Sequence, residues 1–250
     1  MVEQRYVSQQ LIHFVGRKEP DDDARYALLR RIIKSGWLVS GAMARTPIED
    51  LPSRIQQVSY GYPLNLANID LNTAFVSDVV CFADIPQQDL GLHMRKYGRF
   101  GLSFTKEYLL TKGGNPVFYI SKRSTDQSEG GATFDTLFRR ELQNYIDINN
   151  SFQAGLRNMG RMYTQDETSQ FKIHIFLLKY FVSFLKFWNH TDDDKKEDNY
   201  YMEREWRVFG GFQFAITDVQ KIVLPRQYTS AFRNDFPDYA NELSFADIAA

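Results

Sequence analysis

The chain has 250 residues, and its 30 Lys and Arg residues against 31 Asp and Glu residues give a formal net charge of −1. This balance excludes a protein that binds nucleic acid through its overall charge, although it leaves a local basic surface open. The single cysteine, Cys81, excludes a disulfide framework and a cysteine zinc site within one chain, and it favours a reducing cytoplasm.

Hydrophobic residues make up 43% of the chain and aromatic residues 15%, which is enough to form a substantial core. The most apolar stretch, residues 171–188, is interrupted by three lysines and a histidine, which argues against a membrane span and for a buried helix. The first ten residues are polar and do not resemble a signal peptide. We therefore expect a globular cytoplasmic protein of mixed α and β structure that does not enter a membrane.

The first half of the chain is expected to alternate short strands and helices. A strand over residues 10–17 contains His13, and the helix that follows over residues 24–35 begins after an acidic turn and ends at Gly36. Residues 41–77 contain three prolines and are long for a structureless loop, so they predict a lid or an insertion. The other expected elements are strands over residues 37–40, 75–84 and 99–105 and helices over residues 89–97 and 106–112.

The second half is expected to hold a helical block at about residues 134–188. The expected elements are a strand over 116–120, a polar linker over 121–133, helices over 134–159 and 169–188, a solvated acidic loop over 189–199, strands over 200–211 and 221–224, and a helix over 227–236. We predict an α+β protein in which residues 1–250 form one domain with a split, mixed or antiparallel β core and this helical insertion.

The strand expected over residues 200–211 carries charges in an otherwise apolar setting. Side chains two apart in a strand share a face, so Glu203, Glu205 and Arg207 are expected to point the same way. Such charges are costly to bury unless they pair or bind something. These residues allow two interpretations. Either Arg207 forms an ion pair with a glutamate, or this face of the strand lines a cleft in which one glutamate is catalytic.

Three expected strands carry His13, Ser103 and Glu205 in this order, and the order resembles that of the mono-ADP-ribosyltransferases. These enzymes cleave NAD at its nicotinamide–ribose bond and transfer the ADP-ribose to a nucleophile. The resemblance implies a β core of the ADP-ribosyltransferase type and NAD as the substrate. It implies no metal.

The segment Glu203-Arg204-Glu205 matches the Glu-x-Glu pattern of some of these enzymes, whose second Glu is catalytic. The resemblance therefore implies that Glu205 stabilises an oxocarbenium-like ribose and that Glu203 orients the acceptor, which would be a protein or a nucleic acid.

The same resemblance implies five residues that would hold NAD. They are His13 in the first strand, Arg17 at the phosphates, Ser103 in the middle motif, and Tyr97 or Tyr108 stacked on the nicotinamide. The middle motif matches loosely, and His13 stands where Glu-x-Glu enzymes usually have Arg. His13 also suits a core histidine, and both tyrosines suit packing roles.

A second resemblance covers about residues 5 to 230. Residues 11–17, 80–86, 97–104 and 203–207 are similar to segments of the AbiGi family of abortive phage resistance, whose members are described as antitoxins. This resemblance implies a setting in anti-phage defence and a cognate toxin or antitoxin protein as partner.

Our leading hypothesis is an ADP-ribosyltransferase that acts as a toxin or effector in this defence. The alternative is a non-catalytic antitoxin in which Glu203, Glu205 and Arg207 form an ion-pair network and a Phe-rich helix packs against a toxin. The stripe that would do so, Phe176, Tyr180, Phe184 and Phe187, has helical spacing.

A third hypothesis is a metal-dependent nuclease that uses Asp84, Glu203 and Glu205. It is less favoured because no lysine follows Glu205 at the usual offset of two residues.

Overall fold

The computed structural model describes residues 8–41, 43–60, 78–86, 90–122, 134–158, 164–189 and 200–246. The strands are β1 (Gln10–Val15), β2 (Trp37–Val39), β3 (Val79–Ala83), β4 (Phe100–Thr105), β5 (Asn115–Pro116), β6 (Phe118–Lys122), β7 (Leu185–Asn189), β8 (Glu205–Phe209), β9 (Gly211–Gln213), β10 (Lys221–Leu224) and β11 (Glu242–Phe245). The α-helices are α1 (Asp22–Ser35), α2 (Leu51–Tyr60), α3 (Leu90–Tyr97), α4 (Lys106–Thr111), α5 (Phe134–Asn158), α6 (Gln165–Tyr180) and α7 (Thr229–Asp235).

Among the described residues, the largest sheet has seven strands in the order β11-β10-β4-β1-β3-β8-β5. Neighbouring strands in this sheet pair antiparallel, except that β10 and β11 are parallel. Two smaller sheets pair β2 with β9 antiparallel and β6 with β7 parallel. The predicted α+β class with a mixed, mostly antiparallel core is therefore confirmed.

The boundaries of α1 follow from its capping residues. The side chain of Asp21 accepts a hydrogen bond of 2.8 Å from the backbone N–H of Ala24, and Asp22 and Asp23 place negative charge in the first turn. Gly36 ends the helix with φ at 66°, a left-handed conformation that favours glycine. The helix thus begins close to its predicted first residue and ends as predicted.

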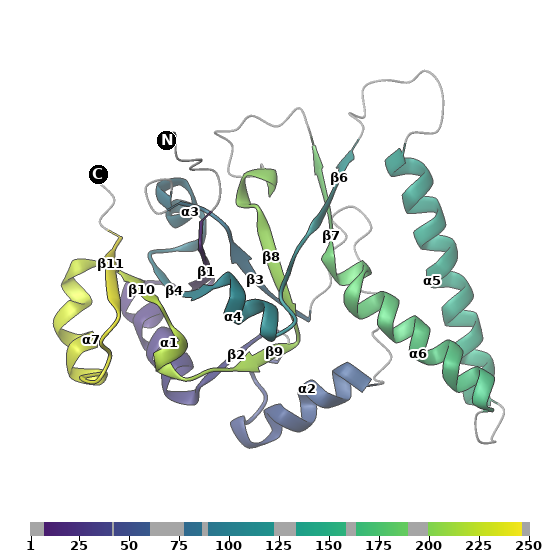
Figure 1. The fold of residues 1–250 in the computed structure, drawn as a ribbon, viewed down its shortest axis with the longest axis horizontal. Coiled ribbons are helices and arrows are strands. Elements are labelled where there is room, and N and C mark those ends of the chain that lie inside the picture. The colour runs from purple at the N-terminus through teal and green to yellow at the C-terminus, as the bar shows by residue number, and fades with distance from the viewer. Residues whose placement is uncertain are drawn as a thin grey trace.

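The seven-stranded sheet has two covered faces. We call the first the α1 face, because the core that includes Leu11, Phe82 and Leu102 packs with Leu29 of α1. We call the other the α3 face, where Ile12 and Ala83 pack with Leu90 of α3. Beside α3, residues of β3 and β8 on this second face pack with β6, β7 and α5 in a separate apolar cluster. Figure 1 shows α5 and α6 at one end of the molecule, beyond β6 and β7.

One predicted helix is shorter than expected. The helix predicted over residues 169–188 ends at Tyr180, and residues 185–189 form β7 instead. Phe187 is buried in the cluster with β6 and α5, and Leu185 pairs with Phe118 of β6. The pairing with a distant strand therefore overrides the helical spacing of the aromatic residues.

The strand predicted over residues 200–211 is also shorter. Tyr200–Glu203 is a 3-10 helix, Arg204 has a φ of 41°, and β8 begins only at Glu205. Gly210, with a φ of 73°, separates β8 from β9, which begins at Gly211 with a φ of 146°. Glu203 therefore lies before the strand rather than within it.

Several predictions fall partly or wholly outside the described residues, three of them over long segments. These are residues 61–77 of the predicted lid, 123–133 of the linker and 190–199 of the acidic loop. Within the described part of the lid, α2 covers Leu51–Tyr60. Strands β9 and β11 were not predicted.

Candidate functional site

Strand β8 places the side chains of Glu205 and Arg207 inside the protein. The two residues pair with Ala83 and Cys81 of β3 and point to the α3 face. Glu205 is 4% exposed and Arg207 is 1% exposed. A buried charge is costly unless it is paired, so the contacts of these two side chains decide what the site can do.

Arg207 donates hydrogen bonds to protein groups through its Nε and Nη1 atoms. Its Nε donates to Glu205 Oε1 at 2.7 Å, and its Nη1 donates to the carbonyl oxygens of Ser183 at 2.8 Å and Leu185 at 3.1 Å. These carbonyls lie just after the end of α6 and at the start of β7. Arg207 therefore connects β8 to the segment that leads out of α6.

Lys186 on β7 joins the two acidic residues. Its Nζ donates to Glu203 Oε2 at 2.9 Å and to Glu205 Oε2 through a short contact. Glu203 Oε1 accepts from Lys96 Nζ at 2.9 Å and from the hydroxyl of Tyr97, both on α3. Each of the four carboxylate oxygens of Glu203 and Glu205 thus accepts a hydrogen bond from the protein. We call Lys96, Lys186, Glu203, Glu205 and Arg207 the buried charge cluster.

The electrostatics of the cluster favour the charged forms. Burial raises the pKa of Glu205, but the charges of Arg207 and Lys186 outweigh it and lower this pKa from 4.5 to about 2. Burial opposes the charge on Glu203 in the same way, and Lys186, Tyr97 and Lys96 lower its pKa overall. Conversely, the nearby glutamates raise the pKa of Lys186 above its usual value despite burial. The two carboxylates face three cations and stay ionised at neutral pH.

This arrangement leaves neither carboxylate available for chemistry without breaking an ion pair. Burying a closed ion network suits a structural role, in which it fixes the relative positions of α3, β7 and β8. The expectation that Arg207 pairs with a glutamate is met. The same-face expectation is met for Glu205 and Arg207, while Glu203 reaches the cluster from the 3-10 helix before the strand.

His13 does not share a cleft with Glu205. Its neighbour Ile12 pairs with Ala83, which pairs with Glu205, so those three side chains point to the α3 face. Successive side chains alternate, so His13 points to the α1 face, where its ring lies 5.7 Å from that of Phe82. Its Nδ1 lies 2.8 Å from the carbonyl oxygen of Cys81, and burial lowers its pKa. The structure therefore separates the two residues that the ADP-ribosyltransferase reading brings together.

Two of the predicted NAD-binding residues do lie at the buried charge cluster. Tyr97 donates its hydroxyl to Glu203, and burial together with Glu203 raises the pKa of that hydroxyl, so it remains a donor. The guanidinium of Arg17 lies 5.1 Å from the centre of the Tyr97 ring and is exposed.

The other two lie elsewhere. Ser103 is completely buried in β4, and its hydroxyl donates to Gln10 Oε1 at 2.9 Å. Tyr108 is on α4 at the α1 face, stacked on Phe104 at 5.6 Å and bonded to Asp218 at 3.0 Å. Ser103 lies on the α3 face, as Glu205 does, but three strands away in the sheet, and Tyr108 lies on the α1 face, so these five residues do not form one cluster. Whether any of them binds a ligand stays a prediction.

Sequence reasoning missed two cations of the cluster, Lys96 and Lys186. Lys186 is one of three lysines in the apolar run over residues 171–188, and a lysine in such a run can indicate a buried acidic partner. His93 is buried on α3 beside the cluster, its ring lies 6.4 Å from that of Tyr97, and its Nδ1 has no hydrogen-bond partner among the described residues. Burial lowers its pKa.

The acidic residues of the described chain do not assemble a metal site. Asp84, a nuclease candidate, pairs with Lys106 Nζ at 2.7 Å and accepts from the backbone N–H of Ser8. Within the described ranges, no group of three His, Cys, Asp or Glu side chains is placed to hold a metal ion. No described helix combines the length and the apolar character needed to cross a bilayer.

An exposed apolar surface lies on α6 and beside its end. Ile173, Phe176 and Tyr180 follow the spacing of one helix face, and Phe181 and Phe118 extend it, with exposed fractions between 41% and 60%. The rings of Phe176 and Tyr180 lie 5.2 Å apart, and those of Phe118 and Phe181 lie 6.0 Å apart. We call these five residues the α6 surface; α6 itself can be followed in Figure 1.

Comparison with known proteins gives one finding. A family model described as "Putative abortive phage resistance protein AbiGi, antitoxin" matches residues 67–249. No curated protein and no solved structure matches the chain. The matched residues include the whole buried charge cluster and the whole α6 surface.

The prediction of an ADP-ribosyltransferase toxin is therefore wrong, because the matching family is described as an antitoxin. The closed ion network at Glu205 and the opposite orientation of His13 give the physical reason. The finding agrees with the alternative prediction, an antitoxin in which the acidic pair forms an ion network.

Proposed function

The chain belongs to the AbiGi family of abortive phage resistance proteins, and on that basis we propose that it is an antitoxin that binds and neutralises a cognate toxin protein. In this role it acts by forming a complex, and the acidic pair of β8 serves the scaffold. The observation that carries the proposal is the α6 surface, a run of exposed aromatic and aliphatic side chains next to a rigid, charge-paired core.

Contiguous exposed apolar side chains mark protein interfaces, and aromatic residues are enriched at the centre of such interfaces. Phe176, Tyr180 and Phe181 bring three aromatic rings to the α6 surface, and Phe118 on β6 adds a fourth. A helix that presents side chains at this spacing fits an apolar groove on a partner. The partner we propose is therefore a toxin with an apolar groove or face that covers α6.

The buried charge cluster supports this surface. Arg207 holds the carbonyls of Ser183 and Leu185, and Lys186 is held by the two glutamates, so the chain that leaves α6 is fixed against the main sheet. Phe181 lies between the last residue of α6 and the carbonyl of Ser183 that Arg207 holds, and its ring packs against that of Phe118. A fixed surface loses less conformational entropy on binding than a mobile one, which favours a tight complex.

Two predictions from the sequence are independent of this proposal. The ADP-ribosyltransferase type of the β core and NAD as a ligand stay predictions of the sequence. Binding to a toxin protein needs neither of them.

A growth assay tests the proposal. The chain expressed alone should leave the growth of a host cell unchanged, and its expression should restore growth to cells arrested by the toxin encoded in a neighbouring gene. The double variant Phe176→Glu with Tyr180→Glu should fail to restore growth, because it places two charges in an apolar interface.

Leu110→Glu is the matched control, since Leu110 is 54% exposed on α4, away from the α6 surface. This variant should neutralise the toxin as well as the wild type does. Growth arrest by the wild-type chain alone would contradict the proposal.

A further inference from the structure

Strand β11 forms one edge of the seven-stranded sheet, and among the described residues it pairs only with β10. The N–H of Ala246 donates to the carbonyl oxygen of Leu224 at 3.0 Å. Backbone groups alternate in direction along a strand, so those of Ser244 and Ala246 face β10, while those of Leu243 and Phe245 point away from the sheet. Such an outward row of donors and acceptors is a template on which another strand can add.

The two edges of this sheet differ in their protection against a further strand. The opposite edge is β5, which consists of Asn115 and Pro116 alone, and proline has no N–H to donate. Strand β11 has no proline, and Glu242 is its one charged residue. Glu242 forms an ion pair with Lys221 of β10 at 3.0 Å, so its charge is balanced within the chain. The edge over residues 243–245 is therefore uncharged and continuous.

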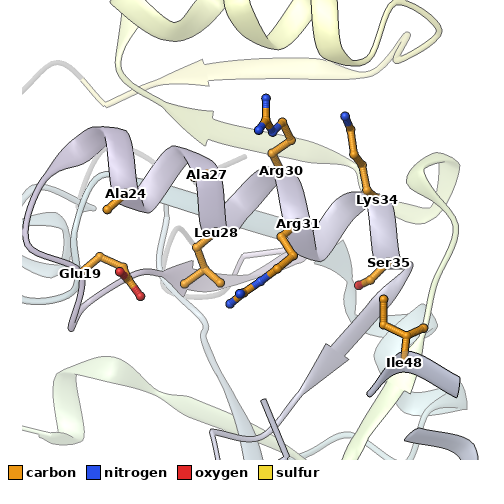
Figure 2. A pocket seen from close by; sticks show the side chains of 9 residues that line it. All are labelled: Glu19, Ala24, Ala27, Leu28, Arg30, Arg31, Lys34, Ser35 and Ile48. Carbon is orange, nitrogen blue, oxygen red and sulfur yellow. The ribbon is translucent and has the colours of Figure 1, made fainter. Parts of the chain in front are cut away.

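Helix α7, which precedes β11 in the chain, is held over the α1 face of the sheet. Its Phe232 is buried in the core of that face, and its Asp235 lies 3.6 Å from Arg30 and 3.8 Å from Lys34 of α1. Both cations project from one side of α1 in Figure 2. These contacts hold α7 against α1, and Phe245 at the end of β11 stays 37% exposed.

We propose that β11 pairs with β11 of a second copy of this chain, in antiparallel orientation about a twofold axis that passes through Ser244. In this register Leu243 lies opposite Phe245 of the partner subunit, and Phe245 lies opposite Leu243 of the partner subunit. Facing residues whose backbone groups point at each other exchange two hydrogen bonds, so these two pairs satisfy the outward groups of both edges. The two seven-stranded sheets then form one continuous sheet.

The apolar side chains of β11 complement their own copies. Side chains that face each other in an antiparallel pair lie on the same face, so both pairs of Leu243 with Phe245 lie on the α1 face. Leu243 already packs against the core of that face, and the second strand extends this core. The guanidinium of Arg226 lies 4.3 Å from the centre of the Phe245 ring, and the leucine of the second copy contacts the part of the ring that is still exposed.

No like charges meet across this axis. The small side chain of Ser244 lies opposite its own copy, and Glu242 lies opposite Ala246 of the partner subunit. Like charges that face each other destabilise a strand pair, and this register contains none. Closed twofold dimers, in which both subunits use the same patch, are also the commonest homo-oligomers.

This dimer is independent of toxin binding. Figure 1 shows β11 at one end of the molecule and α6 at the other, so both α6 surfaces stay accessible in the dimer. The paired edge is short and the interface is small, so the dimer should form only at high protein concentration. A chain that neutralises its toxin as a monomer would therefore leave the proposed function in place.

Sedimentation equilibrium of the full chain tests the proposal. The mass should rise with concentration, up to about 0.5 mM, from the 29.2 kDa of one chain towards twice that value. Phe245→Pro removes an outward N–H and the ring but keeps the pairing with β10, because proline is tolerated on an edge strand where its nitrogen faces solvent. This variant should keep the mass of one chain at every concentration.

Leu110→Ala is the matched control, since Leu110 is an exposed apolar residue on α4, and it should dimerise as the wild type does. Circular dichroism should show that all three chains are folded. A wild-type chain that keeps the mass of one chain over the whole range would overturn the proposal, and so would dimerisation of Phe245→Pro at the wild-type concentration.

A cysteine at the axis tests the register. The two copies of residue 244 form a pair without mutual hydrogen bonds, whose Cα atoms lie about 4.5 Å apart, within the about 4.4 to 6.8 Å that a disulfide spans. Ser244→Cys should therefore yield a disulfide-linked dimer under mild oxidation. Glu242→Cys is the matched control, because its two copies lie about 13 Å apart along the strands and should not cross-link. Equal cross-linking of the two variants, or cross-linking through residue 242 alone, would contradict this axis.

Discussion

Glu205 and Arg207 lie two residues apart on β8 and pair with each other inside the protein, with 2.7 Å between Oε1 and Nε. Neither side chain has appreciable contact with solvent. The pair is extended by Lys186, which reaches Glu205 from β7. A carboxylate held in this way contributes to the stability of the fold.

Replacing Glu205 with Gln should destabilise the protein. The change leaves Arg207 and Lys186 buried with one anion fewer, and breaking a buried ion pair costs about 3 to 5 kcal/mol. Urea denaturation should show a loss of about 3 kcal/mol in the free energy of unfolding. Glu107→Gln, at an exposed position on α4, should change it by less than about 0.5 kcal/mol. A Glu205→Gln chain as stable as the wild type would mean that the carboxylate is not structural.

Stability should fall in acid in a defined pH window. The pKa of Glu205 is lowered from 4.5 to about 2 by Arg207 and Lys186, against the effect of burial. A carboxyl group with a lowered folded pKa contributes stability that is present above its unfolded pKa and lost as pH falls through the folded pKa. Thermal unfolding should therefore show a loss between about pH 4.5 and pH 2.

The Glu205→Gln chain separates this effect from other titrating groups, including His13, whose lowered pKa also destabilises the protein in acid. The difference in stability between the two chains should shrink across the same window. A difference that stays constant down to pH 2 would show that Glu205 has an ordinary pKa.

Lys186 and Glu205 should be energetically coupled. Lys186 also pairs with Glu203 at 2.9 Å, so Lys186→Met leaves two carboxylates with less positive charge. The two single variants and the double variant with Glu205→Gln form a cycle. The double variant should lose less stability than the sum of the single variants, by about 1 kcal/mol or more. Strictly additive losses would show that the network does not act as a unit.

Gly211 is required by the turn between β8 and β9. Its φ is 146°, and a Cβ there would lie 2.5 Å from the carbonyl oxygen of Leu38 and 2.7 Å from the Cα of Val39. Gly211→Ala should therefore lower the free energy of unfolding by about 2 kcal/mol or more.

Gly41→Ala is the matched control, because a Cβ at Gly41 meets nothing within 4 Å. It should be neutral or slightly stabilising, since alanine restricts the unfolded chain more than glycine does. Equal stabilities for the two variants would contradict the described turn.

Elements with local signals could be predicted from the sequence. The acidic cap and Gly36 define α1, Gly98 follows α3 with φ at 98°, and the alternating segments around His13, Ser103 and Ile222 are strands as expected. Each of these signals lies within the element or next to it.

Elements that depend on distant partners could not be predicted in this way. Phe187 of β7 continues the helical spacing of Phe176, Tyr180 and Phe184, and only the parallel pairing of β7 with β6 makes this segment a strand. Strand β11 exists as the parallel neighbour of β10, about twenty residues earlier.

Which side chains share a face at the candidate site depends on the pairing register of the strands. Side chains alternate along a strand, so a shift of one residue in pairing decides whether His13 faces Glu205 or faces away from it. The observed pairing of Ile12 with Ala83, and of Ala83 with Glu205, places His13 on the α1 face. Sequence alone gave the acidic pair and its arginine, but it could not show that Lys96 and Lys186 close the network.

The affinity of the purified chain for its cognate toxin tests the central claim most directly. Isothermal titration should show a stoichiometric complex with the wild-type chain and with Leu110→Glu. The Phe176→Glu, Tyr180→Glu double variant should bind at least about thirtyfold more weakly, as expected for two residues at the centre of an interface. Binding of the double variant with wild-type affinity would contradict the assignment of the α6 surface as the toxin-binding site.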